Sequence, residues 1–257
     1  MKTNEALQLR DAKVLRLDFI RELKVYHAAL CIYSNSSQEV FPEMEQVLHP
    51  TELAYGSTLV YEKRRQDYLI GRYAAKIAIH AFDPSTAMYD VQVGHGVFRQ
   101  PIVRHPNESR IGVSISHSEG LAAAVAFEEE HPMGIDIEYV PRLLLDTVLE
   151  QLTDFERRLL GSGPWSKQDS AAALWVSKEA LSKTLKTGLT TPLHIFEIEE
   201  ARFEKGLHGI LLICTFRNFF QYKSVVFKWG DYMCSLCFPR KSEMSYAARE
   251  LDEPPCR

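Results

Sequence analysis

The sequence lacks a long uninterrupted apolar run. Its longest apolar stretches, such as residues 121–127, are far shorter than the roughly 20 residues that a membrane-spanning helix needs. The first 21 residues alternate charged and apolar side chains and contain no apolar stretch typical of a signal peptide. We therefore expect a cytoplasmic protein that does not associate with membranes.

The chain also lacks an excess of positive charge, with 30 Lys and Arg against 34 Asp and Glu and a formal charge of −4. This balance argues against a general nucleic-acid binder. The cysteines are few, odd in number and scattered, which argues against a disulfide framework. Cys234 and Cys237 form a single CxxC pair in a strand-like run, where the two thiols would point to opposite faces. Packed thiols are therefore favoured over metal or redox chemistry.

What is present is a globular composition, with 46% apolar and 25% charged residues over 257 positions. Helical spacing of apolar residues predicts helices over residues 59–82 and 170–186, and a capping box predicts a shorter helix from about residue 153. A loop or short hairpin is expected over residues 94–110. Alternating or apolar runs predict strands over residues 112–118, 121–127, 133–138, 196–203, 209–216, 224–229 and 231–238.

Helices and strands in mixed order, with hairpin-like strand pairs, indicate an α+β fold of two similar-sized lobes. We expect an N-terminal lobe over residues 1–130, a C-terminal lobe over residues 131–240, and a flexible tail over residues 241–257.

Two carboxylates of one predicted strand lie on the same face, because Asp136 and Glu138 are two residues apart. Such carboxylates repel each other unless a cation or a proton lies between them. Hard oxygen ligands suit Mg²⁺. A strand with a solvated acidic face is the alternative interpretation.

The second long helix places Trp175, Glu179 and Lys183 on one stripe. Glu179 could be a third metal ligand or a base, and Lys183 a phosphate contact; an ordinary exposed Glu–Lys pair is the alternative. Ser116 and His117 end a strand before a turn, where they could donate to a phosphate or simply cap the turn. No nucleophile elbow surrounds them, which argues against hydrolase chemistry.

The first long helix carries a basic side near its start. The helix begins with Lys63, Arg64 and Arg65, and Arg65, Arg72 and Lys76 fall on one side of it at i, i+7 and i+11. Guanidinium groups of this kind hold terminal phosphates well, although a solvated helix face has the same appearance. There is no Walker pattern and no GxGxxG, so a nucleotide-hydrolysing fold has no support.

Taken in order along the chain, these segments resemble the motifs of the 4′-phosphopantetheinyl transferases, and most closely the monomeric type that activates surfactin synthetase. The resemblance spans about residues 60–190. Its most specific parts are Gly134-Ile-Asp-Ile-Glu138 and Trp175-Val-Ser-Lys-Glu-Ala-Leu-Ser-Lys183, preceded by Gly71-Arg72, Gly96…Pro101 and Ile115-Ser-His-Ser118.

The resemblance implies two lobes related by a pseudo-twofold axis, each a helix packed on a small, mostly antiparallel sheet, with the ligand cleft between them. It implies Mg²⁺-dependent transfer of the 4′-phosphopantetheine arm of coenzyme A to a serine of an apo acyl or peptidyl carrier protein. Adenosine 3′,5′-bisphosphate would be released. The products would serve fatty-acid, polyketide or nonribosomal-peptide synthesis, and we expect a monomer.

The resemblance also implies roles for individual residues. Mg²⁺ would be held by Asp136, Glu138 and Glu179. Coenzyme A would be contacted by Arg64 or Arg65, Arg72, Ser116, His117, Asp136 and Lys183. Glu179 and Lys183 would be catalytic, Glu179 accepting the serine proton and Lys183 steadying the leaving phosphate.

The sequence departs from the family pattern in two places. A Gly-Lys-Pro segment is here Gly96-Val-Phe-Arg-Gln-Pro101, so that Arg99 or Arg104 would replace the lysine. A Gly-Lys-Gly run after the second long helix is here Lys186-Thr-Gly188, which leaves carrier preference open, with a docking patch expected near Lys186 and Leu189. Two other functions compete with transfer: a coenzyme A or carrier-binding module without turnover, which would need a damaged set of acidic residues, and a magnesium-dependent phosphohydrolase.

Overall fold

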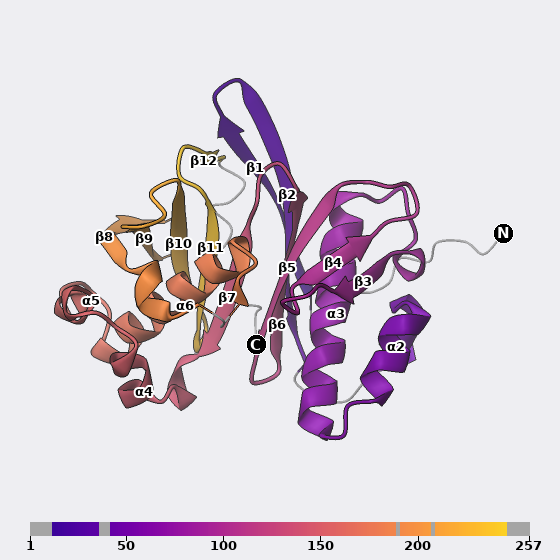
Figure 1. Ribbon diagram of the computed structural model, residues 1–257, viewed down its shortest axis with the longest axis horizontal. Coiled ribbons are helices and arrows are strands. Elements are labelled where there is room, and N and C mark those ends of the chain that lie inside the picture. Colours follow the sequence, from indigo (N-terminus) through magenta and orange to yellow (C-terminus); the bar gives the residue numbers. More distant parts are fainter. Residues whose placement is uncertain (1–11, 36–41, 189–190, 207–208, 246–257) are drawn as a thin grey trace.

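The computed structural model describes residues 12–35, 42–188, 191–206 and 209–245 and consists of two five-stranded sheets with a long helix outside each (Figure 1). All strand pairs are antiparallel. No helix within these ranges is both long enough and apolar enough to cross a membrane.

The first sheet has the order β12-β1-β2-β6-β5, and a two-stranded hairpin, β3–β4, lies beside it. The elements of this half are β1 (Ala12–Arg21), β2 (Lys24–Ser34), α1 (Pro42–Val47), α2 (Pro50–Ser57), α3 (Glu62–Phe82), the short helix η1 (Met88–Asp90), β3 (Gln92–His95), β4 (Pro101–Arg104), β5 (Ile111–Ser118) and β6 (Leu121–Glu128). Small residues let α3 lie close to the sheet, since Ala74, Ala75 and Ala78 pack against Ala122 and Ala124 in one buried cluster.

The second sheet has the order β7-β11-β10-β9-β8 and is covered by α6. Its half contains β7 (Gly134–Tyr139), η2 (Val140–Arg142), α4 (Leu145–Glu150), α5 (Asp154–Leu159), α6 (Lys167–Thr184), η4 (Leu193–Phe196), β8 (Ile198–Lys205), β9 (Ile210–Phe216), β10 (Tyr222–Trp229) and β11 (Tyr232–Pro239). The chain then returns to the first sheet with β12 (Glu243–Met244). The capping box predicted at Thr153 and Glu156 is confirmed at the start of α5.

The two sheets share a core. Leu17, Phe19 and Leu30 from the first sheet and Phe227 and Leu236 from the second belong to one buried cluster. The layers therefore run α3, first sheet, second sheet, α6, which Figure 1 shows with the helices on opposite sides of the strands. The predicted α+β fold, with a helix on an antiparallel sheet in each lobe, is confirmed.

Edge strands β5 and β7 of the two sheets lie side by side and are joined by serine side chains. The Oγ atoms of Ser114, Ser116 and Ser118 accept hydrogen bonds from the backbone N–H groups of residues 135, 137 and 139, at 3.1, 3.2 and 3.1 Å. We call this contact the serine seam. It brings the Ser116-His117-Ser118 segment next to the acidic strand β7.

Two features differ from or go beyond the predictions. The hairpin of β1 and β2 was not predicted, and its turn projects beyond the rest of the molecule (Figure 1). The expected tail begins with ordered structure, because Glu243 and Met244 pair with Ile20 and Phe19 of β1. The remainder of that tail, residues 246–257, lies outside the described residues, as does Leu189.

The predicted positions of the cysteines are confirmed. Cys234 lies in the cluster between the sheets and Cys237 in the cluster beneath α6, so their thiols are on opposite faces of β11. Both are free and fully buried, and burial raises the pKa of Cys237 to about 12. Both thiols are therefore packing groups.

Candidate active site

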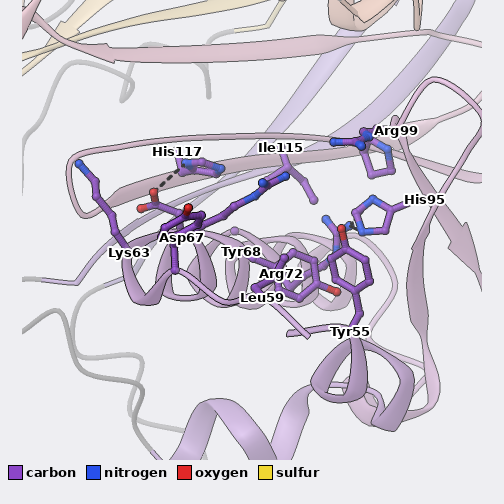
Figure 2. Close-up of a pocket in the computed structure, with 14 residues that line it drawn as sticks. Tyr55, Leu59, Lys63, Asp67, Tyr68, Arg72, His95, Arg99, Ile115 and His117 are labelled. Carbon is purple, nitrogen blue, oxygen red and sulfur yellow. Dashed lines mark hydrogen bonds and ion pairs between the residues drawn. The ribbon is translucent and has the colours of Figure 1, made fainter. Parts of the chain in front are cut away.

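A pocket of about 700 Å³ lies between α3, the β3–β4 hairpin and β5 (Figure 2). We call it the basic pocket, because its lining has four basic side chains and one acidic side chain. Its lining residues are Tyr55, Leu59, Tyr61, Lys63, Arg64, Asp67, Tyr68, Gly71, Arg72, His95, Arg99, Pro101, Ile115 and His117. Positive charge beside three tyrosine rings suits a ligand that carries both phosphate and an aromatic base.

Arg72 is at the centre of one wall of this pocket. Its Nη2 lies 3.2 and 3.3 Å from the two ring nitrogens of His95, and its guanidinium lies 4.9 Å from the Tyr68 ring centroid. Arg72 is 6% exposed, and among the described residues its Nε has no hydrogen-bond partner. Burial and the nearby Arg72 charge lower the pKa of His95, which keeps that ring neutral. Arg72 therefore has its charge and one donor available for an anion.

His117 faces the pocket from the end of β5. Its Nδ1 lies 4.0 Å from Asp67 Oδ2 of α3 (Figure 2), and its side chain is 44% exposed. Partial burial lowers the pKa of His117, and the nearby Asp67 carboxylate opposes this effect. Helix α3 can approach β5 here because residue 71 is glycine; a Cβ at Gly71 would lie 3.2 Å from Ile115 Cγ2.

The predicted acidic residues lie at the serine seam. Asp136 and Glu138 project from β7, and Glu179 projects from α6, which packs on the same strand. Burial raises the pKa of Glu179 to about 7, and the charges of Asp136 and Glu138 add to the effect, while Lys183 opposes it. Burial raises the pKa of Glu138, and the charge of Asp136 adds to this effect. The three carboxylates therefore lie near enough for their charges to act on one another.

Asp136 is held by two donors. Lys183 Nζ lies 2.7 Å from its Oδ1, and Ser116 Oγ donates to the same atom at 2.8 Å. Lys183 also donates to the Ile115 carbonyl at 3.2 Å. Among the three acidic residues, the charge of Asp136 is therefore already balanced by the ammonium group of Lys183.

The donor set fits a hard divalent cation in kind. Asp136, Glu138 and Glu179 all carry carboxylate oxygens, and Glu179 Oε1 is buried with no hydrogen-bond partner among the described residues. As these side chains lie, no set of three His, Cys, Asp or Glu within the described part of the chain forms a metal-binding cluster. Asp136 is paired with Lys183 in this arrangement.

A second pocket of about 280 Å³ continues from the basic pocket, since both are lined by Arg99, Pro101 and Ile115. Its other wall comes from α6 and the residues after it, including Glu179, Lys183 and Lys186. We call it the seam pocket. Glu179 and Lys183 therefore line a space that borders the basic pocket.

The predicted coenzyme A contacts divide into two groups. Arg64, Arg72 and His117 line the basic pocket, whereas Arg65 does not and lies 3.9 Å from exposed Glu62. Ser116 is 6% exposed, and its hydroxyl donates to Asp136 rather than into a pocket. Of the alternatives Arg64 and Arg65, only Arg64 lines this pocket, and the Ser116 hydroxyl takes part in the seam; contacts of Arg65 and Ser116 with a ligand stay predictions.

Lys76, predicted on the basic side of the helix, is buried instead. Its Nζ lies 3.1 Å from Glu52 Oε1, and both side chains are almost fully buried. The structure adds pocket residues that were not predicted, namely Tyr55, Asp67, Tyr68 and His95. Tyr68 is one of the apolar residues whose helical spacing predicts the helix over residues 59–82, and no local sequence pattern links His95 or Tyr55 to that helix.

Two family models match the chain. The model of the 4′-phosphopantetheinyl transferase superfamily matches residues 132–237, and that of the 4′-phosphopantetheinyl transferase N-terminal domain matches residues 58–127. The boundary between the matches falls at the connection from β6 to β7.

Similar proteins have been named holo-[acyl-carrier-protein] synthase. One from Lactococcus lactis is 32% identical over 94 residues, which are 34% of this chain and 79% of the relative. One from Lacticaseibacillus casei is 38% identical over 93 residues, which are 34% of this chain and 74% of the relative. A crystal structure of a holo-(acyl-carrier-protein) synthase from Bacillus anthracis, in complex with CoA (3′,5′-ADP), aligns with a TM-score of 0.35 and 20% identity over 43% of this chain and 96% of that one.

The chain therefore belongs to the 4′-phosphopantetheinyl transferase superfamily, and it is an enzyme of that class.

Proposed function

We propose that this enzyme transfers the 4′-phosphopantetheine arm of coenzyme A to the acceptor serine of an apo carrier protein. The observation that carries the proposal is the meeting of Asp136, Glu138, Glu179 and Lys183 at the serine seam, beside a basic and aromatic pocket. The family matches and the names of the relatives support it.

The reaction places few covalent demands on the protein. The serine oxygen bonds to the phosphorus that carries the pantetheine arm, and the bond from that phosphorus to the bridging pyrophosphate oxygen breaks. Adenosine 3′,5′-bisphosphate leaves with those electrons, and the serine gives up its proton. Such a reaction depends on positioning the groups and balancing their charge.

Within this scheme Glu179 accepts the serine proton. A carboxylate whose pKa is raised to about 7 by burial and by neighbouring acids is a better base near neutral pH than a free glutamate. Lys183 balances charge on the leaving phosphate once its ammonium moves from Asp136 to the substrate. The 2.7 Å contact between Lys183 and Asp136 keeps that ammonium at the site beforehand.

Mg²⁺ is the cation that this donor set favours, and Asp136, Glu138 and Glu179 are the residues that would hold it. When bound, Mg²⁺ supplies positive charge against the pyrophosphate. Arg64, Arg72 and His117 are then the residues that hold the adenosine end in the basic pocket. Lys183, which lines the seam pocket, and its partner Asp136 are the residues that contact the pyrophosphate in this proposal.

The acceptor is an acyl or peptidyl carrier protein in this proposal. Because residues of one chain line both pockets, a monomer can bind coenzyme A without a second copy.

The test is intact-mass analysis of an apo carrier protein incubated with the enzyme, coenzyme A and Mg²⁺. We expect a mass increase equal to one phosphopantetheine arm, lost with Glu179→Gln and with a chelator. A binding module would leave the carrier mass unchanged. A phosphohydrolase would release phosphopantetheine or phosphate when no carrier is present, and either result would contradict the proposal.

A further inference from the structure

The turn between β3 and β4 is where the chain departs from the family's Gly-Lys-Pro pattern. Four residues stand between Gly96 and Pro101 in place of one. Two of them are large apolar side chains that are held in solvent: Val97 is 91% exposed and Phe98 is 59% exposed.

This turn has a fixed geometry. Gly96 N–H donates to the Gln100 carbonyl at 2.8 Å, and Arg99 N–H donates to the Gly96 carbonyl at 3.0 Å. Phe98 N–H donates to Gln100 Oε1 at 2.9 Å, so the side chain of Gln100 closes the turn from within. A Cβ at Gly96 would overlap that carboxamide, which explains the glycine. Val97 and Phe98 are therefore presented outward by a turn whose polar groups are already paired.

The turn borders the seam pocket. Phe98 and Arg99 line that pocket together with Lys186 and Gly188, which follow α6, and a Cβ at Gly188 would lie 3.7 Å from the Phe98 carbonyl oxygen. The residues after α6 are also fixed, because Ser182 Oγ donates to the Gly188 carbonyl at 2.9 Å. Two ordered loops, one from each half of the molecule, thus frame the entrance to the space that contains Glu179.

The charge of this entrance differs from that of the whole chain. The charged residues lining the seam pocket are the basic residues Arg99, Lys183 and Lys186 and the acidic residue Glu179, whereas the chain carries −4 overall. An acidic partner is attracted to this entrance and repelled by the average surface. Exposed apolar side chains within a charged rim are typical of a protein–protein contact.

We propose that Val97, Phe98, Arg99 and Lys186, here called the tip surface, dock the carrier protein, with the two apolar side chains against its surface beside the acceptor serine. This inference rests on the proposed function, because the docked serine must reach Glu179. The carrier is an acidic protein in this proposal, and the extended turn makes Val97 and Phe98 determinants of which carrier is accepted.

The experiment measures binding without transfer. A carrier whose acceptor serine is replaced by alanine is titrated into the enzyme by calorimetry, beside a titration with coenzyme A. We expect Val97→Ser/Phe98→Ser to raise the Kd for the carrier at least tenfold and to leave the Kd for coenzyme A within twofold. Lys186→Glu should weaken carrier binding as well, and most strongly at low salt.

The control is Leu23→Ser/Val25→Ser, because Leu23 and Val25 are 105% and 44% exposed in the unrelated β1–β2 hairpin. It should bind the carrier as the unmodified enzyme does. Thermal unfolding of each variant shows that the fold is kept.

Unchanged carrier binding by Val97→Ser/Phe98→Ser would overturn the docking proposal, and so would a complete absence of carrier binding by the unmodified enzyme. Loss of a dimer in sedimentation, with carrier binding unchanged, would assign the tip surface to a second copy instead. Failure of the proposed function has a different signature, namely no mass increase on the carrier that keeps its serine.

Discussion

Glu179 shows the cost of an acidic site within a packed protein. Its Oε1 is buried without a partner, and the charges of Asp136 and Glu138 act against its ionisation. Residues that serve a reaction are commonly unfavourable for folding. We therefore expect Glu179 to lower the stability of the metal-free protein while serving transfer.

The first prediction concerns the stability of Glu179→Gln. The pKa of Glu179 is raised to about 7 in the folded protein from an ordinary value of 4.5, so the folded protein favours the protonated carboxyl group. The stability that the protonated group contributes is complete below pH 4.5 and is lost as the pH rises through 7. At pH 8 without metal the variant should be more stable by about 2 kcal/mol in urea unfolding, allowing for partial exposure, and no more stable at pH 4.

The exposed Glu200→Gln is the matched control and should change stability at neither pH. An E179Q protein that is less stable than the unmodified one at pH 8 would show that Glu179 is stabilised by partners in the fold.

The second prediction concerns Arg72. Its guanidinium is buried against His95 and Tyr68 and keeps one donor without a partner, so lysine cannot replace its planar contacts. A lost charged hydrogen bond is worth about 1.5–3 kcal/mol. Arg72→Lys should therefore weaken coenzyme A binding by roughly tenfold to a hundredfold in calorimetry.

Arg65→Lys is the control, since Arg65 lies on the same helix but does not line the basic pocket. Equal losses in the two variants would mean that the ligand does not occupy that pocket.

At the scale of elements, the same device recurs in both halves. A glutamate of a capping box is buried against a lysine of the long helix: Glu52 with Lys76 at 3.1 Å, and Glu156 with Lys178 at 2.8 Å. Each glutamate also accepts from the backbone N–H of a nearby residue, Val93 in one half and Ile198 in the other, at 2.6 and 2.9 Å. The repetition of a buried ion pair supports a pseudo-twofold relation between the halves, although the two sequences share no visible repeat.

The third prediction concerns the contact of β7 with α6. A Cβ at Gly134 would lie 2.5 Å from Thr184 Oγ1 and 2.7 Å from Thr184 N, and still closer to the Ala180 carbonyl oxygen. Backbone atoms cannot move aside, so Gly134→Ala must push β7 away from the helix that carries Glu179. We expect a loss of about 3 kcal/mol or more of unfolding free energy in urea.

Gly161→Ala is the matched control. It has φ of +73° but no atoms within 4 Å of the new methyl group. Only the left-handed backbone would cost energy there, about 1–2 kcal/mol. A smaller loss for Gly134→Ala than for this control would contradict the close contact.

The elements also show which parts of the fold the sequence can reveal. The long helices and the strands from residue 111 onward were predicted because their periodicity is local. The hairpin of β1 and β2 was missed although β1 alternates, because β2 is a central strand whose residues 28–33 are all buried. A run buried on both faces has no period of two to detect.

The candidate site also has features that local sequence patterns predict and features that they do not. Asp136 and Glu138 share a strand, and Glu179 and Lys183 share a helix face, so sequence spacing indicated both pairs. Their convergence depends on the packing of α6 against β7, which no spacing within one segment encodes. For the same reason the sequence does not show that the Ser116 hydroxyl donates to Asp136 and accepts from the backbone of β7.

At the scale of the whole molecule, His131 lies where the chain passes from the first sheet to the second. It is 1% exposed, and its ring centroid lies 4.9 Å from those of Phe19 and Tyr26. Its Nε2 lies 2.8 Å from Ser242 Oγ, in the segment that leads back to β12. His131 therefore joins the connection between the halves to the strand that closes the first sheet.

The last prediction follows from the charge that this histidine cannot carry. Burial, aided by Arg21 and opposed by Glu128, lowers the pKa of His131 to about 4 from an ordinary 6.5. The unfolded chain thus binds the proton more tightly, so stability is complete above pH 6.5 and falls as the pH drops toward 4. The loss should reach about 2–3 kcal/mol at pH 4.

His131→Phe keeps the ring stacking and removes the titration, so the unfolding free energy of this variant in urea should fall less between pH 6.5 and pH 4. At pH 8 the variant should be less stable than the unmodified enzyme, because Ser242 loses its partner. Parallel pH profiles for both proteins would show that the ring is already charged or solvated in the fold. Glu179 lowers the stability of the fold as the pH rises from 4.5, and His131 lowers it as the pH falls from 6.5. The metal-free enzyme should therefore show a broad maximum of stability between these two pH values. Glu179→Gln should shift this maximum to higher pH, and His131→Phe should shift it to lower pH.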